Sequence, residues 1–421
     1  MRGLFFVLFF FHHTSFAQVC DTTKNPIVFM HGFLASGDTY AVQIQRFAEK
    51  GYCNNRLFVF DWNTLAGKKT DSLLDVFINN VLADTKSKKV ELIGHSAGGG
   101  LGRAYLIDSA HAAKVAHYIH IGSRKWFTAS PYFPNKKCLN IYSMADMVTG
   151  KAGGDIEGAS NLALNDKDHY QVATSEETFN AIYQFINDDG KYPVIPTHLP
   201  YNISLIAGKA VLLGSNEPMA NATIAVYELN DKTGLRNKGK AIKIMKADTN
   251  GNWGSAILST KKHYEFELIP DDENERTISY FYEPFKQNNY HIYLRGFPKN
   301  NMIGAMLGNL PNKDDQSVIV LYSATKAIIN GRDSVTVNGI PVSSPSLTPA
   351  SKTIISSFIF DDGDGKTSGD GLRQFSIAPF LGGVDIALPV SNKTNVLFYN
   401  GRKLYLPAMP SKERIMLAIF N

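Results

Sequence analysis

The ten residues from Val90 to Gly99 constrain the fold of this chain more than any other stretch. They read Val-Glu-Leu-Ile-Gly-His-Ser-Ala-Gly-Gly, so a short apolar run of strand character meets Gly-x-Ser-x-Gly, and helix-compatible residues follow. A strand, a sharp turn that carries a serine, and a helix are typical of a nucleophile elbow. Ser96 must then adopt a strained backbone, and Gly94 and Gly98 lack the Cβ atoms that would keep strand and helix apart. The pattern predicts Ser96 as a nucleophile.

Strands and helices alternate around this motif from residue 25 to about 190, which predicts an α/β domain with a mainly parallel sheet. Thr174 and Glu177 have the spacing of a capping box at the start of the last helix. The expected strands cover residues 26–30, 57–60, 90–95, 115–121 and 139–142, and the expected helices cover 40–50, 71–84, 97–110 and 175–186.

Beyond a proline-rich stretch the pattern changes to alternating aromatic and β-branched runs, separated by Asn, Asp and Gly turns. This half is predicted to be all-β, as a sandwich or a barrel. The predicted organisation is a signal peptide at 1–17, an α/β domain at 18–190, a linker at 191–200, a β-sandwich at 201–299 and a further β-domain at 300–421.

The first 17 residues have the features of a secretory signal peptide. Arg2 is a positive start, residues 4–11 are apolar, and Ser15-Phe16-Ala17 is a small-x-small cleavage site. We therefore expect cleavage near Ala17 and a secreted protein, extracellular or periplasmic. A net charge of +5 spread over 421 residues gives no basis for nucleic-acid binding.

Export permits disulfides, but three cysteines leave at least one thiol unpaired. Cys20 and Cys53 both precede predicted strands, so a bridge between them would tie the mature terminus to the sheet. The alternative is that both thiols are free. None of the cysteines has the spacing of metal ligands.

A serine hydroxyl needs a base, and the base needs a carboxylate that orients it. In an α/β fold with this elbow the partners follow in the order Ser, acid, His, each on a loop after a strand. Only His169 of the eleven histidines lies after the last acid loop and before the closing helix. Asp146 follows the strand at 139–142 and is the predicted acid, with Asp155 as the alternative.

The oxyanion of a tetrahedral intermediate would be bound by the N–H of Ala97 and by one N–H from the loop after the first strand. That loop reads His-Gly-Phe-Leu from His31 to Leu34, which predicts the Phe33 N–H as the second donor. The Phe33 side chain would then face an acyl pocket; ordinary core packing is the alternative.

Residues 25–188 resemble secreted bacterial and archaeal lipases of the α/β-hydrolase fold, and residues 201–421 resemble their β-rich C-terminal half. Within that half, residues 201–299 are similar to a transthyretin-like, carboxypeptidase-regulatory sandwich, and the final hundred residues resemble a lipid-associated β-domain. The resemblance implies carboxylic ester hydrolysis, with Ser96, Asp146 and His169 at the triad positions. Ala97 departs from the Met or Gln common in those lipases, which leaves the substrate size open. The matching stretches are Val28–Phe33, Gly94–Gly99, Ala113–Tyr118, Asp168–Ser175, Gly208–Val211, Thr223–Tyr227 and Gly251–Gly254.

Two further segments carry weaker signals. The 16-residue connection from Gly122 to Lys137 contains Trp126 and Phe127, which we expect to rim the acyl pocket as a short lid; a buried plug is the alternative. Clustered carboxylates and glycines from Asp361 to Gly365 suit calcium, although a solvated hairpin fits better because the full loop spacing is missing.

The sequence therefore predicts a secreted serine esterase, most simply a triacylglycerol lipase, that needs no cofactor or metal and acts on an ester or lipid. The resemblance of its C-terminal residues to a lipid-associated domain implies a lipid interface there, although the sequence alone does not assign the role of the β-half. The alternatives are a short-chain or polyester carboxylesterase, an amidase, or an inactive secreted binding protein that acts through its β-half.

Overall fold

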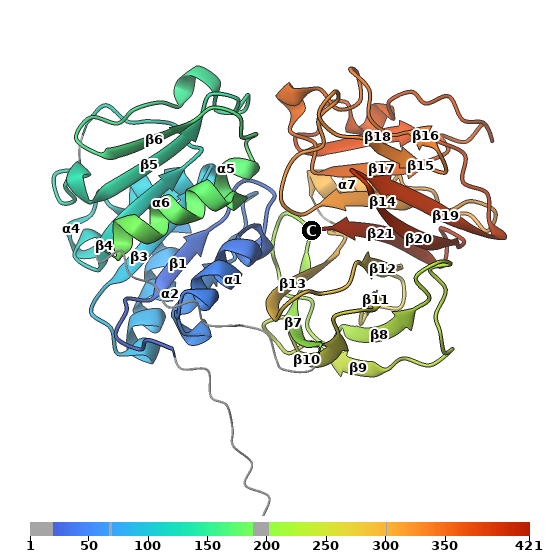
Figure 1. The fold of residues 1–421 in the computed structure, drawn as a ribbon, viewed down its shortest axis with the longest axis horizontal. Helices are drawn as coiled ribbons and strands as arrows, with labels where there is room; N and C mark the ends of the chain where they lie inside the picture. The colour runs from blue at the N-terminus through green and yellow to red at the C-terminus, as the bar shows by residue number, and fades with distance from the viewer. Residues whose placement is uncertain (1–19, 67–69, 129, 188–201, 300) are drawn as a thin grey trace, which may run out of the picture.

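A computed structural model describes residues 20–66, 70–128, 130–187, 202–299 and 301–421. The predicted signal peptide and linker lie outside these residues. Figure 1 shows two bodies side by side: an N-terminal α/β domain (residues 20–187, blue to green) and a C-terminal β region (residues 202–421, yellow-green to red). In the described part of the chain, no helix is long and apolar enough to cross a membrane.

The α/β domain is built on one parallel sheet of six strands in the order β2-β1-β3-β4-β5-β6. The strands are β1 (Ile27–Met30), β2 (Leu57–Phe60), β3 (Val90–His95), β4 (Val115–Ile121), β5 (Cys138–Ser143) and β6 (Ser160–Leu164). The first five confirm the predicted strands. β6 was not predicted because it is an edge strand with mostly exposed residues and has no apolar run.

Helices cover both faces of this sheet, which confirms the predicted α/β-hydrolase architecture (Figure 1). α1 and α6 pack on one face, and α2 and α3 pack on the other. The helices are α1 (Ala41–Glu49), α2 (Thr70–Thr85), α3 (Ala97–Tyr105), α4 (Ser109–Ala112), α5 (Gln171–Thr174) and α6 (Glu176–Ile186), with short 3-10 turns η1 (Gly37–Tyr40), η2 (Asn54–Arg56), η3 (Asn135–Lys137) and η4 (Gly150–Ala152).

The predicted capping box at the start of α6 is wrong by one residue. Ser175 is the N-cap, and its hydroxyl accepts a hydrogen bond from the Thr178 N–H at 3.2 Å. The Thr174 hydroxyl instead donates to the Thr325 carbonyl of the C-terminal β region at 2.5 Å, and Glu177 pairs with Lys167 at 2.9 Å. Thr174 therefore contacts the C-terminal β region and does not cap α6.

The C-terminal β region contains three sheets, of three, eight and four strands, in the orders β10-β7-β13, β18-β17-β14-β21-β12-β11-β8-β9 and β16-β15-β19-β20. Its elements are β7 (Ile203–Leu212), β8 (Thr223–Leu229), β9 (Lys243–Lys246), β10 (Asn252–Ser259), β11 (His263–Ile269), β12 (Thr277–Tyr282), β13 (Asn289–Gly296), α7 (Met302–Leu307), β14 (Ile319–Ser323), β15 (Val335–Val337), β16 (Ile340–Pro341), η5 (Ala350–Lys352), β17 (Ser356–Phe360), η6 (Arg373–Phe375), β18 (Leu381–Asp385), β19 (Ser391–Tyr399), β20 (Arg402–Ala408) and β21 (Arg414–Phe420).

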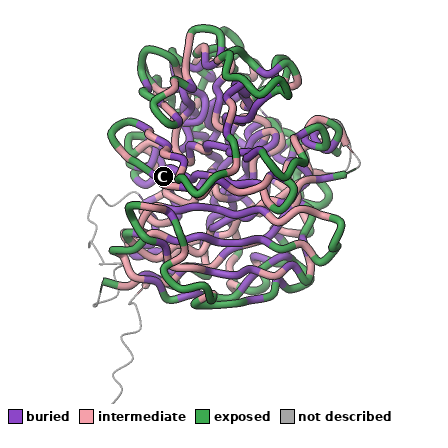
Figure 2. Tube along the Cα trace, turned by 90° about the vertical axis from the view of Figure 1, so that its right-hand side faces the viewer, coloured by how far each residue is buried: buried purple, intermediate pink, exposed green. Residues whose placement is uncertain are grey.

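The eight-stranded sheet is the middle layer of this region and is buried on both faces. On β21, Met416 and Phe420 join the core under the four-stranded sheet, whereas Ile419 joins the core under the three-stranded sheet. β12 pairs in parallel with β21, so one sheet crosses the predicted boundary at residue 299. The cores cross it as well, because Ile419 joins the core of residues 206–294, and Phe281 joins the core under the four-stranded sheet. Figure 2 shows buried strands in these layers and exposed connections around them.

The cysteines settle one of the alternatives left open by the sequence. Cys20 and Cys53 form a disulfide, with Cα atoms 5.0 Å apart, which ties the start of the described chain to the turn before β2. Cys138 on β5 is a free, buried thiol, and burial raises its pKa. A buried thiol of this kind packs as a small apolar side chain.

Candidate active site

Ser96 occupies the sharp turn between β3 and α3. Its φ of 54° and ψ of −119° lie outside the regions that residues other than glycine favour, as the elbow motif predicts. The glycines around it are required by space. A Cβ on Gly94 would lie 2.4 Å from the Gly98 carbonyl oxygen, and a Cβ on Gly98 would lie 2.2 Å from the Met30 carbonyl oxygen. The motif therefore brings β1, β3 and α3 together beneath the serine.

Three side chains form a chain of hydrogen bonds that starts at this serine. The Ser96 Oγ lies 2.9 Å from His169 Nε2, and His169 Nδ1 lies 2.8 Å from Asp146 Oδ2. His169 and Asp146 are buried, so little water competes for these bonds. Asp155, the alternative acid, instead accepts a hydrogen bond from the Tyr142 hydroxyl at 2.8 Å. The structure brings together the three residues that the sequence singled out.

Asp146 is held as a carboxylate by its surroundings. Burial raises the pKa of Asp146, but hydrogen bonds from His169 and from the side chain and backbone of Thr149 more than offset it and lower the pKa to about 2. The Thr149 hydroxyl donates to Oδ2 at 2.7 Å, and the Val148 N–H donates to Oδ1 at 2.9 Å. The carboxylate is thus fixed on the side of the ring away from Ser96.

The loop that carries His169 is fixed from both bodies. His95 Nε2 lies 2.8 Å from the His169 carbonyl oxygen, so the His95 side chain points away from the nucleophile, as expected of a structural histidine. Asp168 is buried, and its Oδ2 accepts hydrogen bonds from Arg332 Nη1 at 2.7 Å and from the Ala327 N–H at 3.1 Å. Arg332 and Ala327 belong to the C-terminal β region.

The two predicted oxyanion donors lie beside Ser96. Ala97 begins α3, and a Cβ on Gly32, next to Phe33, would lie 3.1 Å from the Ser96 Cβ. Neither the Phe33 N–H nor the Ala97 N–H donates to another residue within the described ranges. Two N–H groups near a candidate nucleophile, neither used by the fold, are what an oxyanion site requires.

Three parts of the chain match models of known protein families. Residues 24–118 match the model of class 2 lipases, residues 202–299 match the lipase C-terminal domain, and residues 321–414 match a further C-terminal domain. The chain is similar to class 2 lipases. These matches support an ester hydrolase with a C-terminal β region.

Solved structures that match part of the chain are distant from it in sequence. A Bacillus licheniformis lipase is 16% identical, over 40% of this chain and 94% of that one, with a TM-score of 0.32. A predicted hydrolase from Thermoplasma acidophilum is 16% identical, over 40% and 89%, with a TM-score of 0.32. The carboxylesterase CesB of Bacillus subtilis is 11% identical, over 40% and 86%, with a TM-score of 0.30.

A cavity of about 440 Å³ lies between the two bodies of this ester hydrolase. Phe33 and Tyr170 of the α/β domain line it, together with Tyr322 and Phe380 of the β region. The Phe380 ring stacks on the His169 ring, with centroids 6.1 Å apart and planes inclined by 11°. Phe380 therefore contacts both the cavity and the candidate catalytic histidine, and Phe33 lines the cavity while also packing on a buried core of the β region.

Trp126 and Phe127 are not brought to this cavity. Trp126 packs with Tyr118 and His120 on the side of the sheet that α2 and α3 cover, and the Phe127 side chain is 88% exposed. For Trp126 the alternative of a buried plug describes the observed packing. Side chains of the β region, such as Tyr322 and Phe380, line the cavity instead.

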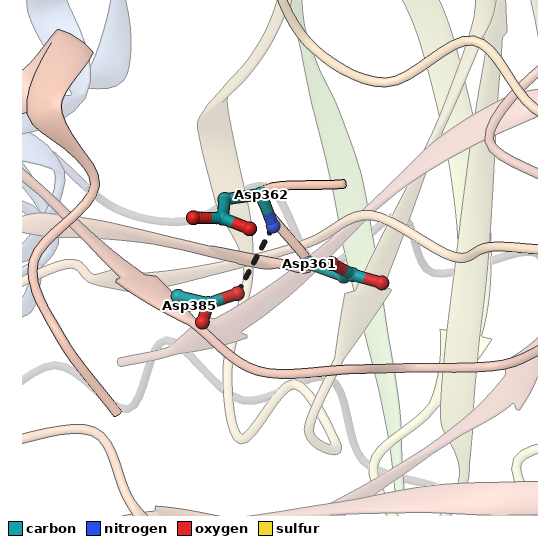
Figure 3. Close-up of side chains that lie close together, drawn as sticks. All are labelled: Asp361, Asp362 and Asp385. Atoms are coloured by element: carbon teal, nitrogen blue, oxygen red, sulfur yellow. Dashed lines mark hydrogen bonds between the residues drawn. The ribbon is translucent and has the colours of Figure 1, made fainter. Parts of the chain in front are cut away.

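The predicted acidic loop has a defined geometry. Asp361, Asp362 and Asp385 each offer a carboxylate oxygen within 4.8 Å of the others (Figure 3). However, Asp385 accepts hydrogen bonds from the Asp362 N–H at 3.0 Å and the Ser368 hydroxyl at 2.5 Å, and Asp361 accepts from the Gly363 N–H at 2.8 Å. The carboxylates are thus used to hold the loop after β17 against β18. The cluster by itself does not indicate a metal site.

Sequence reasoning missed the charged contacts that dock the two bodies. Asp61 pairs with Lys209 at 2.7 Å, and Asp38 pairs with Arg295 at 2.5 Å. Burial raises the pKa of Asp61, but Lys209 and the other partners more than offset this effect, so the pKa is lowered overall. No sequence signal links these residues, which are more than 140 positions apart.

Proposed function

We propose that the chain is a secreted serine lipase that hydrolyses carboxylic esters through Ser96, His169 and Asp146. The observation that carries the proposal is the continuous hydrogen-bond chain from the Ser96 hydroxyl to the buried Asp146 carboxylate. A hydroxyl, an imidazole and a carboxylate in this order form an activated nucleophile on many unrelated folds.

In this mechanism Ser96 Oγ attacks the ester carbonyl carbon while His169 Nε2 takes the hydroxyl proton. Asp146 accepts the hydrogen bond of His169 Nδ1–H and stabilises the imidazolium that forms. The Phe33 and Ala97 N–H groups bind the oxyanion of the tetrahedral intermediate. Collapse of this intermediate releases the alcohol, which takes the proton from His169, and water then repeats both steps on the acyl-enzyme.

The cavity between the two bodies supports an ester with an extended acyl group. Its wall includes Phe33 and Phe380, whose ring stacks on His169, and is mainly apolar, with charged side chains such as Arg295 also present. Pockets of this volume bind ligands mainly through apolar contact. A long acyl chain would fill it, whereas an acetyl group would leave most of it empty, which favours a lipid ester over a short-chain one.

Export remains part of the proposal. The Cys20–Cys53 disulfide supports it, because such bonds persist in oxidising compartments. N-terminal analysis of the protein recovered from outside the cytoplasm should begin at Gln18; a chain retained in the cytoplasm with Met1 intact would contradict export.

Two measurements test the hydrolase proposal. A fluorophosphonate probe should label the wild-type chain and fail to label Ser96→Ala, since the probe reacts with activated serines. Hydrolysis of p-nitrophenyl esters from acetate to palmitate should then rise in kcat/KM with chain length. An unlabelled wild-type chain would support the inactive binding protein, and a maximum at acetate or butyrate would support a short-chain carboxylesterase.

A further inference from the structure

Asn216 lies on the turn between β7 and β8 of the C-terminal β region, yet its side chain reaches into the α/β domain. Its backbone is left-handed, with a φ of 57°, and the residue is buried. A buried amide must satisfy both of its donors and its acceptor, so its partners are informative. All of them belong to the two loops that follow β1 and β2.

The Asn216 amide joins these loops. Nδ2 donates to the Ala35 carbonyl at 2.9 Å and to the Trp62 carbonyl at 3.0 Å, and Oδ1 accepts from the Ser36 hydroxyl at 2.5 Å. Ala35 and Ser36 follow Phe33 by two and three residues. The amide thus fixes the segment directly after the predicted oxyanion donor.

The segment before Phe33 is held by the same amide. His31 Nδ1 lies 2.9 Å from the Gly32 carbonyl and donates to it, so Nε2 is the acceptor in the neutral ring. Nε2 accepts from the Trp62 N–H at 3.3 Å. It also lies 3.2 Å from Asn216 Nδ2, whose two hydrogens it shares with the Ala35 and Trp62 carbonyls. Contacts from Asn216 therefore flank the Phe33 N–H on both sides.

The same turn makes a second contact with the oxyanion loop, through Thr64. The Leu34 N–H donates to the Thr64 hydroxyl at 3.0 Å, and that hydroxyl donates to the Gly214 carbonyl at 3.2 Å. Gly214 lies two residues before Asn216. The turn between β7 and β8 thus contacts the oxyanion loop through both its backbone and its side chain.

We propose that Asn216 is a positioning residue for ester hydrolysis: it holds the loop from His31 to Ser36 so that the Phe33 N–H points at the oxyanion. The inference rests on the proposed function and adds to it, because it makes the β region a part of the catalytic apparatus. An oxyanion donor acts only from a fixed position near 3 Å, so the loop must be rigid before the substrate arrives.

The test compares Asn216→Gly with Asn221→Gly. Both asparagines have left-handed backbones in the β region, with φ of 57° and 63°, and Asn221 is exposed. Glycine adopts this backbone without strain, so each change removes only a side chain. We expect Asn216→Gly to lower kcat on p-nitrophenyl esters about 10- to 100-fold, because misplacing a group near the chemistry costs up to about 100-fold. KM should change less than about twofold, and Asn221→Gly should change neither constant.

A boronic acid that forms a tetrahedral adduct with serine gives a second readout. Asn216→Gly should weaken binding of the boronic acid by the same factor as it lowers kcat, because both depend on the oxyanion donors. A general structural defect would not change the boronate affinity and kcat by the same factor. If Asn216→Gly does not fold, Ser36→Ala removes the hydroxyl that fixes Oδ1 and should show a smaller loss with the same match.

The outcomes separate the two proposals. An active wild-type chain with unchanged kcat and boronate affinity in Asn216→Gly would overturn the role of Asn216. A loss confined to KM, or one shared by Asn221→Gly, would overturn it as well. A wild-type chain without any ester hydrolysis would overturn the proposed function itself, and the inference with it.

Discussion

The α/β domain and the C-terminal β region contribute differently to the candidate active site. Ser96, Asp146 and His169 all belong to the α/β domain, and their hydrogen bonds are complete within it. The β region contributes contacts to the loops around them: Asn216 binds the oxyanion loop, and Arg332 binds Asp168 next to the histidine. The comparison indicates that one body supplies the reactive groups and the other fixes the loops that carry them.

The two bodies also differ in how far apart in the chain their paired strands lie. Neighbouring strands of the α/β sheet are mostly neighbours in the chain, so their pairs span shorter stretches of it. In the β region, β12 pairs with β21 across more than 130 residues. Sheets with such distant pairs form slowly, because closing long loops costs conformational entropy before any contact forms.

The largest effect is expected from a change in the reactive groups of the α/β domain. Asp146→Asn should lower kcat on p-nitrophenyl esters roughly 10⁴-fold, because the amide no longer holds the histidine in the reactive tautomer. Asp155→Asn, on the same connection, should have no effect on kcat. Steady-state kinetics at neutral pH check both, and equal losses would mean that the acid has been assigned to the wrong residue.

The next effect concerns the contact of the β region with the histidine loop. Arg332→Met removes the cation that pairs with the buried Asp168 and Asp333, and we expect a loss of about 2–3 kcal/mol in the free energy of unfolding. The control is Lys412→Met, because its ion pair with Asp314 is exposed. Urea unfolding should show a change within about 0.5 kcal/mol for that control; a similar loss in both variants would contradict the role of burial.

A third experiment compares one aspartate from each body in acid. The pKa of Asp146 is lowered to about 2 despite burial, whereas Asp272 reaches about 2 on the surface, chiefly through a hydrogen bond from Lys299. A carboxyl whose pKa is below its ordinary 3.8 stabilises the fold above pH 4, and this stability is lost as the pH falls toward 2.

For Asp146 the contribution is about 2 kcal/mol, at 1.36 kcal/mol per pH unit. Asp146→Asn should therefore flatten the decline in unfolding free energy between about pH 4 and pH 2, measured by urea titration in 0.5 M salt. Asp272→Asn should leave the decline unchanged there, since salt screens the exposed pair. An unchanged slope in Asp146→Asn would contradict the lowered pKa.

The smallest effect concerns the acyl group. Phe380→Ala should reduce kcat/KM for a decanoate ester about tenfold and for an acetate ester less than twofold, because an apolar pocket wall discriminates by roughly 1–3 kcal/mol. Phe127→Ala should change neither. An equal loss on both esters in Phe380→Ala would mean that the ring acts on His169 alone, and a selective loss in Phe127→Ala would restore the lid hypothesis.

Much of the α/β domain could be predicted because its signals are local. The apolar runs at 27–30, 57–60 and 115–121 are the observed strands, and the elbow at Ser96 needed only five residues to be recognised. The order Ser, acid, His narrowed eleven histidines to His169, which the structure places 2.9 Å from Ser96.

Two of the predictions that failed share one physical cause. The Thr174 cap and the Trp126 lid were inferred as if the α/β domain stood alone, but Thr174 bonds to Thr325, and side chains of the β region line the cavity that Trp126 was expected to rim. β6 was missed because an exposed edge strand needs no apolar pattern.

The sequence by itself determined which groups carry the proposed chemistry, because an elbow, its acid and its histidine are encoded by short patterns and chain order. Only the tertiary structure decided what surrounds them: Phe380 against His169, Asn216 beside the oxyanion loop and Arg332 on Asp168. Such contacts depend on the shape and desolvation of two surfaces that meet after folding, and residues more than 160 positions apart carry no local pattern that links them.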